Sequence, residues 1–120
     1  MSIATYPAVT LPPMRAGETD GRYIDCTLDL GAPGDTFTSA ASITITITRV
    51  DGVPATASDL ALAGASYPTT LDTTKLIPTI WFTAPAASAG VGYVVTLSAT
   101  TTQGRVFIRD AYLTVQALLG

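Results

Sequence analysis

The chain has 120 residues, of which 48% are hydrophobic and 12% charged, with a net charge of −3. This length supports one domain with a substantial core, and the composition argues against a disordered body. Phosphate-binding surfaces need clustered basic residues, whereas the six Lys and Arg residues are scattered here. No apolar run approaches the ~20 residues of a membrane span. We therefore expect neither nucleic acid nor a membrane as a partner.

Histidine is absent, and cysteine occurs once, at Cys26. Without histidine, most metal sites, hydrolase triads and proton shuttles are excluded, and a catalytic thiol would lack its usual partner. A single cysteine excludes an internal disulfide, which fits assembly in the reducing cytoplasm. We interpret Cys26 as a small buried apolar residue. The expectation is a non-enzymatic protein without a metal or cofactor.

Residues 1–14 resemble an extended arm. Three prolines disfavour a helix, yet the segment is rich in apolar side chains, unlike an ordinary disordered tail. Polar residues 15–21 follow as a hinge, so we predict an arm with its hinge over 1–21 and a β domain over 22–120. A second apolar segment ends the chain. These two segments supply the candidate partner interface, which comprises Ile3, Tyr6, Val9, Leu11, Met14, Leu118 and Leu119.

The first clear strand is predicted over 22–30, and Asp25 and Asp29 lie on its polar face. The two aspartates are four positions apart, which places their carboxylates roughly 13 Å apart along a strand. This distance is wider than the carboxylate spacing of retaining or inverting glycosidases, so we interpret the two residues as part of a solvated face. Residues 36–41 are expected to form a short strand or bulge. The apolar face of the first strand comprises Ile24, Cys26, Leu28 and Leu30.

The clearest pattern is Ser42–Val50, where isoleucine and threonine alternate. A period of two places each residue type on its own face of a half-buried strand, and both types are β-branched and suit a pleated surface. Asp51-Gly52 is a hairpin-type turn signal. Residues 54–65 are expected to contain a short strand or a single helical turn. The remaining predicted strands span 77–83, 92–102 and 105–116.

Six or seven strands with turns every 8–12 residues are typical of β-sandwiches. The long hairpin over 92–116 favours an immunoglobulin-like antiparallel β-sandwich of about seven strands, preceded by the extended arm. The single tryptophan, Trp81, is expected to be a buried anchor between the sheets. Phe82 and Phe107 are also expected in the core. Either core packing or an exposed glycan platform remains open for Tyr23, Tyr93 and Tyr112.

Arg105 and Arg109 share a strand face with Phe107. One interpretation is a solvated or edge strand, where charge discourages unwanted pairing. The other is a patch that pairs with Asp25 and Asp29 of the same sheet or of a neighbour. A calcium site built from loop aspartates is disfavoured, because no loop carries the required acidic density. The aspartates weighed for such a site are Asp35, Asp51 and Asp59.

Five segments resemble small virion proteins of tailed bacteriophages, the phage fibre–tail adaptor family. The segments, in chain order, are DCTLDL (25–30), PGDTFTS (33–39), TIWFT (79–83), AGVGYVVTLSATTTQGR (89–105) and a closing R-x-x-x-L-x-V (109–115). The family's first strand often carries Trp after its second acidic residue, where this chain has Leu30. The stretch 50–74 and the arm lie outside the shared pattern.

The resemblance implies a non-enzymatic virion structural protein, assembled in the bacterial host cytoplasm. Such a protein would connect the tail or neck to a fibre through its arm and sheet faces. Its partners would be other virion proteins of the tail, neck, fibre or capsid, and it would be a homo-oligomer in the assembly. Two alternatives stay open from the sequence: a capsid decoration protein, and a carbohydrate- or receptor-binding β module.

Overall fold

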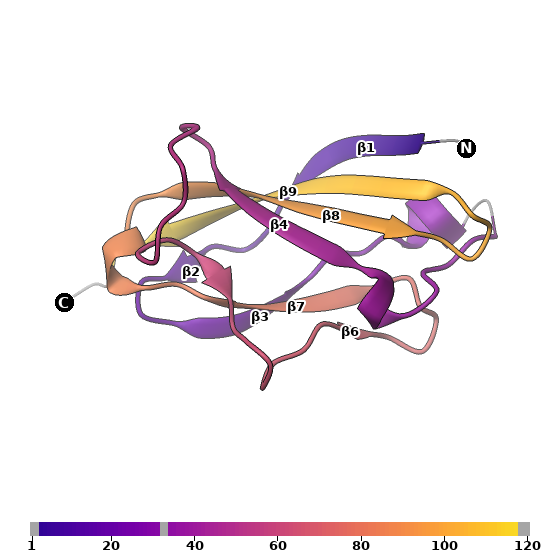
Figure 1. Cartoon of the computed structure of the whole chain (residues 1–120), viewed down its shortest axis with the longest axis horizontal. Coiled ribbons are helices and arrows are strands. Elements are labelled where there is room, and N and C mark those ends of the chain that lie inside the picture. The colour runs from indigo at the N-terminus through magenta and orange to yellow at the C-terminus, as the bar shows by residue number, and fades with distance from the viewer. Residues whose placement is uncertain (1–2, 32–33, 118–120) are drawn as a thin grey trace.

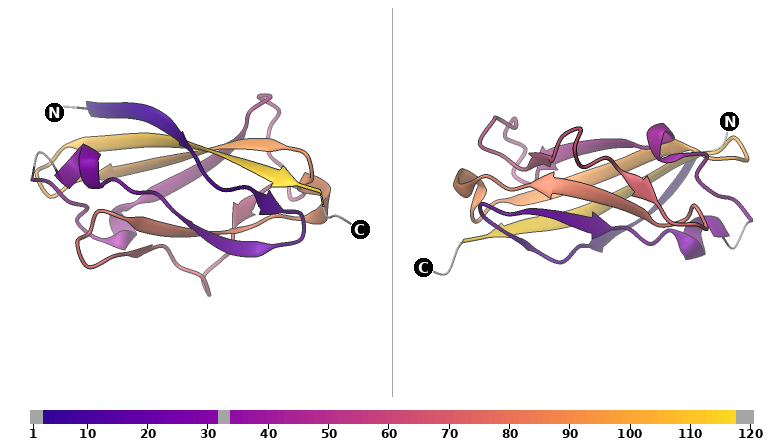
Figure 2. Two further views of the ribbon diagram at one scale, coloured as in Figure 1. Left: turned by 180° about the vertical axis from the view of Figure 1, so that it is seen from behind. Right: turned by 90° about the horizontal axis from the view of Figure 1, so that it is seen from below.

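A computed structural model describes residues 3–31 and 34–117, with side chains described from Ala8 onward. Two β-sheets pack face to face (Figures 1 and 2), which confirms the predicted all-β sandwich. The strands are β1 (Ile3–Thr10), β2 (Met14–Arg15), β3 (Thr19–Tyr23), β4 (Thr44–Arg49), β5 (Ala61–Leu62), β6 (Thr70–Leu71), β7 (Pro78–Thr83), β8 (Gly92–Thr100) and β9 (Val106–Gln116). Single helical turns occur at Thr27–Gly31, Ala40–Ser42 and Ala86–Ser88.

The sandwich consists of a five-stranded and a four-stranded sheet. One sheet has five strands in the order β1-β9-β8-β4, with β2 also beside β9; the other has four, in the order β3-β7-β5, with β6 also beside β7. The β8–β9 hairpin is antiparallel and continuous from Gly92↔Thr114 to Thr100↔Val106. The first strand instead runs parallel to the last, β9 (Figure 2). This hairpin with its long, fully alternating strands is the centre of the fold.

The segment predicted as an arm belongs to the sandwich, so the expected boundary at residue 22 is wrong. Its backbone is extended, as expected, but it pairs with β9 through β1 and β2. The Leu11 and Met14 side chains are 4% and 0% exposed and lie in the core. The prolines explain why both descriptions fit the sequence: Pro7 lies in an edge strand, where a missing N–H is tolerated, and Pro12 and Pro13 lie between strands.

The strand predicted over 22–30 ends early. The N–H groups of Ile24 and Cys26 still donate to the carbonyls of Pro78 and Leu76, each at 3.0 Å. The chain then turns. The Asp25 carboxylate accepts the N–H of Thr27 at 2.9 Å, and such local bonds divert the chain from a sheet ladder. Leu28 is therefore 85% exposed instead of lying on the apolar face.

The other predicted strands are confirmed as β4, β7, β8 and β9. In β4 the threonines are exposed and the isoleucines are half-buried. Residues 36–41 contribute only an isolated bridge between Phe37 and Thr101, and 54–65 contains the two-residue strand β5. The core lies between the sheets and includes Phe37 and Phe107, whose rings meet edge to face at 5.6 Å.

The prediction that Trp81 anchors the core is wrong. Ile80 and Phe82 point inward and are fully buried, so the period of two turns Trp81 to the outer face of the four-stranded sheet. Gly21, its register partner on β3, makes room for the ring: a Cβ at Gly21 would lie 3.1 Å from the indole. The indole therefore lies against the β3 backbone.

Candidate interaction surfaces

The outer face formed by β4, β8 and β9 carries almost no charge. Asp110 is its one charged residue among the outward side chains of β4, β8 and β9, and its carboxylate accepts the Thr96 hydroxyl at 2.7 Å. Hydroxyl and aliphatic groups of this kind can be buried without desolvating ions. We call this surface the threonine face; it comprises Thr44, Thr46, Thr48, Val94, Thr96, Ser98, Thr100, Val106, Ile108, Asp110, Tyr112 and Thr114.

Asp35 is held at the end of the sandwich where β8 turns into β9. The residue is 1% exposed, and its carboxylate accepts the Arg105 Nε–H at 2.9 Å and the Thr102 hydroxyl at 2.8 Å. Burial acts to raise the pKa of Asp35, but the hydroxyl and guanidinium hydrogen bonds outweigh it and hold that pKa well below its usual range. Asp35 is thus a structural anion that fixes the β8–β9 turn.

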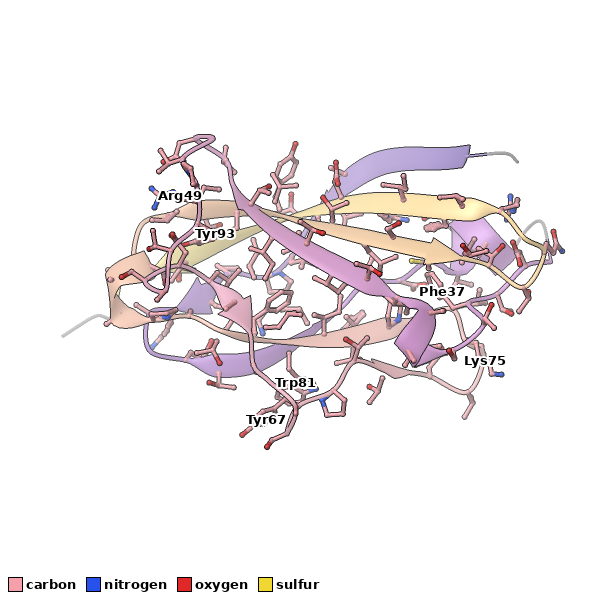
Figure 3. The ribbon with its side chains drawn as sticks, viewed as in Figure 1. Phe37, Arg49, Tyr67, Lys75, Trp81 and Tyr93 are labelled. Atoms are coloured by element: carbon pink, nitrogen blue, oxygen red, sulfur yellow. The ribbon has the colours of Figure 1, made fainter. Side chains whose placement is uncertain are left out.

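A second polar network occupies the opposite end of β8 (Figure 3). The buried Tyr93 hydroxyl donates to Asp59 Oδ1 at 2.7 Å, and Arg49 Nη1 lies 3.1 Å from the same oxygen. Arg49 Nη2 also pairs with Asp51 at 2.8 Å. Backbone N–H donation from Thr56, followed by the Tyr93 hydroxyl, lowers the pKa of Asp59. Tyr93 is therefore a core residue and has no part in a glycan platform.

The aspartates weighed as calcium ligands are not brought together. Asp51 and Asp59 both contact Arg49, while Asp35 lies at the other end of the sandwich with Arg105. Across residues 3–31 and 34–117, no group of three or more His, Cys, Asp or Glu side chains is placed to hold a metal ion.

Arg109 points into the sandwich from β9 and forms an ion pair with Asp29 of the same chain. Of the two interpretations left open for Arg105 and Arg109, the structure therefore shows pairing within the chain, with Asp29 and Asp35. Asp25 does not join them, because its carboxylate caps the turn at Thr27.

Cys26 lies beside this pair and is fully buried. Burial raises the pKa of the Cys26 thiol to about 11. Only the thiolate is a nucleophile, so at pH 8 roughly one thiol in a thousand would be reactive even with free access. The geometry agrees with the interpretation of Cys26 as an apolar core residue.

We expect Cys26 in the native chain to resist an aromatic disulfide reagent at pH 8 and to react at the rate of unfolding. In concentrated guanidinium chloride the same thiol should react at once and stoichiometrically. The measurement is the absorbance of the released thiolate with time. Rapid stoichiometric labelling in native buffer would show that the thiol is accessible and contradict its assigned place in the core.

A groove of about 510 Å³ lies between the β1–β2 connection and β3. Val9, Leu11 and Ile24 are among its apolar lining. Arg22 crosses it, donating to the carbonyls of Pro12 and Pro13, both at 2.8 Å. The guanidinium also reaches back to its own strand and so joins the edges of the two sheets.

Three of the residues predicted as a partner interface lie in the core or against it. Leu11 and Met14 are buried in the core, and Val9 is half-buried against it. The backbones of Ile3 and Tyr6 pair with Val106 and Arg109 of β9, while their side chains are outside the described residues. Leu118 and Leu119 also lie outside the described residues.

Three aromatic residues lie on the outer face of the four-stranded sheet. Tyr67 packs on Trp81 with ring centroids 5.4 Å apart and a 38° tilt (Figure 3). Tyr23 is diagonal to Trp81 across the β3–β7 pair. Tyr23 is 68% exposed and Tyr67 is 45% exposed. Tyr112 is exposed on the opposite sheet, so it does not join this cluster. The sequence signal for this cluster is Gly21, which lies directly opposite Trp81, but recognising it requires the strand register.

No protein-family model matches the chain, and no curated protein sequence matches it. Within the described part of the chain, no helix is long and apolar enough to cross a lipid bilayer.

Proposed function

We propose that the chain is a non-enzymatic structural protein of a tailed-bacteriophage virion, an adaptor that joins the tail or neck to a fibre. The observation that carries this proposal is the threonine face, a broad sheet surface whose one charged group, Asp110, is already hydrogen-bonded. The resemblance of the five segments to phage fibre–tail adaptors supplies the kind of assembly. Docking through sheet faces replaces docking through an arm, since the N-terminal segment is part of the sandwich.

The placement of ionic groups supports a role in packing against other proteins. Arg49, Arg105 and Arg109 are each paired with aspartates of their own chain, which leaves few charges to desolvate when a neighbour covers the threonine face. Exposed hydroxyls on that face can still donate and accept hydrogen bonds at a wet interface. This role requires neither a catalytic base nor a nucleophile.

A phage that carries the gene provides the test. Deleting the gene should give heads and tails whose fibres are missing, and the wild-type chain supplied from a plasmid should restore fibred particles in electron micrographs. Thr100→Glu places a charge on the threonine face and should fail to restore them. Thr70→Glu, an exposed threonine of the other sheet, is the matched control and should succeed. Normal fibred particles that lack the chain by mass spectrometry would overturn the proposal.

The same experiment distinguishes capsid decoration, which would use the same charge-poor surface on a capsid lattice. In that case the deletion should leave fibres in place and give heads that burst more readily on heating or osmotic shock.

A glycan-binding role is a second candidate, favoured by the aromatic cluster of Tyr23, Tyr67 and Trp81. Sugar rings stack on exposed aromatic faces, and Thr19, Thr79 and Thr83 surround the cluster as hydrogen-bonding groups. Because Trp81 is the single tryptophan, its fluorescence reports directly on this surface. Titration with bacterial surface polysaccharide should shift the emission saturably, with Tyr112→Ala unaffected and Tyr67→Ala weakened. An unchanged spectrum across a panel of such polysaccharides would contradict this role.

A further inference from the structure

The outer edge of β4 is an unpaired sheet edge facing the viewer in Figure 1. The Val50 N–H donates to the Gly92 carbonyl at 3.0 Å, and the β4–β8 register is continuous. Even-numbered β4 residues therefore bond to β8, and the N–H and C=O groups of Ile45 and Ile47 point away from it. Among the described residues, no segment bonds to these outward groups.

The other sheet edges are protected, which makes β4 distinctive. β1 contains Pro7 and a register shift before Val9. On β3, the outward N–H of Gly21 is taken by the Asp20 carboxylate and its carbonyl by Arg22, both at 2.8 Å. β5 and β6 have only two residues each. Proline, bulges, capping charges and shortness are the usual devices against strand addition.

β4 has none of these devices. It has six residues without proline or lysine, and its register shows no shift. Its one charged residue, Arg49, stands at the end of the strand and is held by Asp51 and Asp59. A strand of this kind is a template for pairing with another extended backbone.

We propose that this edge pairs with the same edge of a second copy, antiparallel about a two-fold axis centred on Thr46. Pairing the outward groups of both copies requires odd residues to face odd residues. That parity also sets isoleucine against isoleucine on the inner side and threonine against threonine on the outer side, both favourable cross-strand matches. Centring on Thr46 sets Ile45 opposite Ile47 of the second copy and overlaps the two strands over Thr44–Thr48.

The pairing is electrostatically neutral and covers apolar surface. In this register the two Arg49 residues lie roughly 20 Å apart, at ~3.3 Å per residue, which exceeds a Debye length of ~8 Å. The half-buried isoleucines of β4 would be covered by their counterparts. The two five-stranded sheets would become one continuous sheet, and the threonine faces of both copies would join. This inference does not rest on the virion proposal.

The test is the molar mass of the purified full chain by light scattering across a concentration series. We expect a monomer–dimer equilibrium in the wild type. Thr46→Lys sets like charges opposite each other and should weaken the dimer by about tenfold or more. Thr114→Lys carries the same change on the same face away from the edge and should leave the dimer unchanged. A wild type that stays monomeric at about 1 mM, or a dimer indifferent to Thr46→Lys, overturns the proposal.

A cross-linking experiment tests the register without relying on the lysine variant. Because Cys26 is buried, a cysteine introduced at Thr46 is the accessible thiol. Thr46→Cys should form a disulfide-linked dimer under mild oxidation, since directly opposed residues of a non-hydrogen-bonded pair are close enough to bridge. Thr114→Cys should form no disulfide-linked dimer under the same conditions. Equal cross-linking of both variants, or of neither, would overturn the two-fold pairing at β4.

Discussion

Deleting residues 1–14 is expected to unfold the sandwich. The deletion removes β1, which runs along β9, and takes Leu11 and Met14 out of the core. It also removes the Pro12 and Pro13 carbonyls that accept hydrogen bonds from Arg22. A chain of this size has only about 5–15 kcal/mol of stability to lose. Far-UV circular dichroism and urea titration of the truncated chain are the measurements.

A point variant separates the loss of core packing from the loss of the strand. Met14→Ala, at a fully buried site, should lower the free energy of unfolding by about 2–5 kcal/mol. Thr10→Ala is the control, an exposed residue at the end of β1, and should change it by less than about 0.5 kcal/mol. A truncated chain that unfolds as cooperatively as the full chain would show that the segment is dispensable.

Asp35→Asn is expected to be the most damaging single polar substitution. The change leaves the Arg105 guanidinium beside a neutral amide in a buried position, and breaking a buried ion pair costs about 3–5 kcal/mol. Urea denaturation at pH 7 measures the difference. Asp25→Asn changes an exposed carboxylate that caps one turn and should cost about 0.5–2 kcal/mol at most. Similar losses for both variants would contradict the assigned role of Asp35.

The pH dependence of the same pair follows from the lowered pKa of Asp35. A carboxyl whose folded pKa lies below its unfolded value of about 3.9 stabilises the fold fully above that value. The stability is lost as the pH falls below about 4 and the unfolded chain takes up the proton first. The wild type should therefore keep a constant free energy of unfolding above about pH 5 and lose it steeply below pH 4. Asp35→Asn should show a shallower loss; parallel curves for the two proteins would contradict this.

Strands that alternate without interruption were predictable because side-chain period and backbone geometry agree. β4, β8 and β9 each keep one largely apolar face, interrupted by Arg109 in β9 and ended by Arg49 in β4, so their place in a sandwich follows from local sequence alone. The turn at Asp51-Gly52 is also local: the Gly52 N–H returns to the Arg49 carbonyl, and Gly52 has φ +78°. These elements fix the five-stranded sheet except for its first two strands, β1 and β2.

Features that depend on long-range partners were not predictable. The apolar segment at the N-terminus could pack on its own domain or on a neighbour, and composition does not distinguish the two. The core position predicted for Trp81 followed from its size, whereas the period of two groups Trp81 with Thr79 and Thr83 and places Ile80 and Phe82 on the buried face. Leu28 fits a strand pattern until Asp25 turns the chain. The alternating threonines of β4 predict one strand of the threonine face, but its extension over β8 and β9 can be known only from the strand register.

The parallel pairing of β1 with β9 has a mechanical consequence. β1 starts at one end of the sandwich and β9 finishes at the other (Figure 1). Tension applied to the start of β1 and the end of β9 pulls the paired strands past one another along their length. The evenly spaced bonds of the parallel ladder then share the load together, whereas a pull from one end of a hairpin breaks its bonds one at a time. If neighbouring proteins hold the start of β1 and the end of β9, the domain would resist unfolding under tension between them.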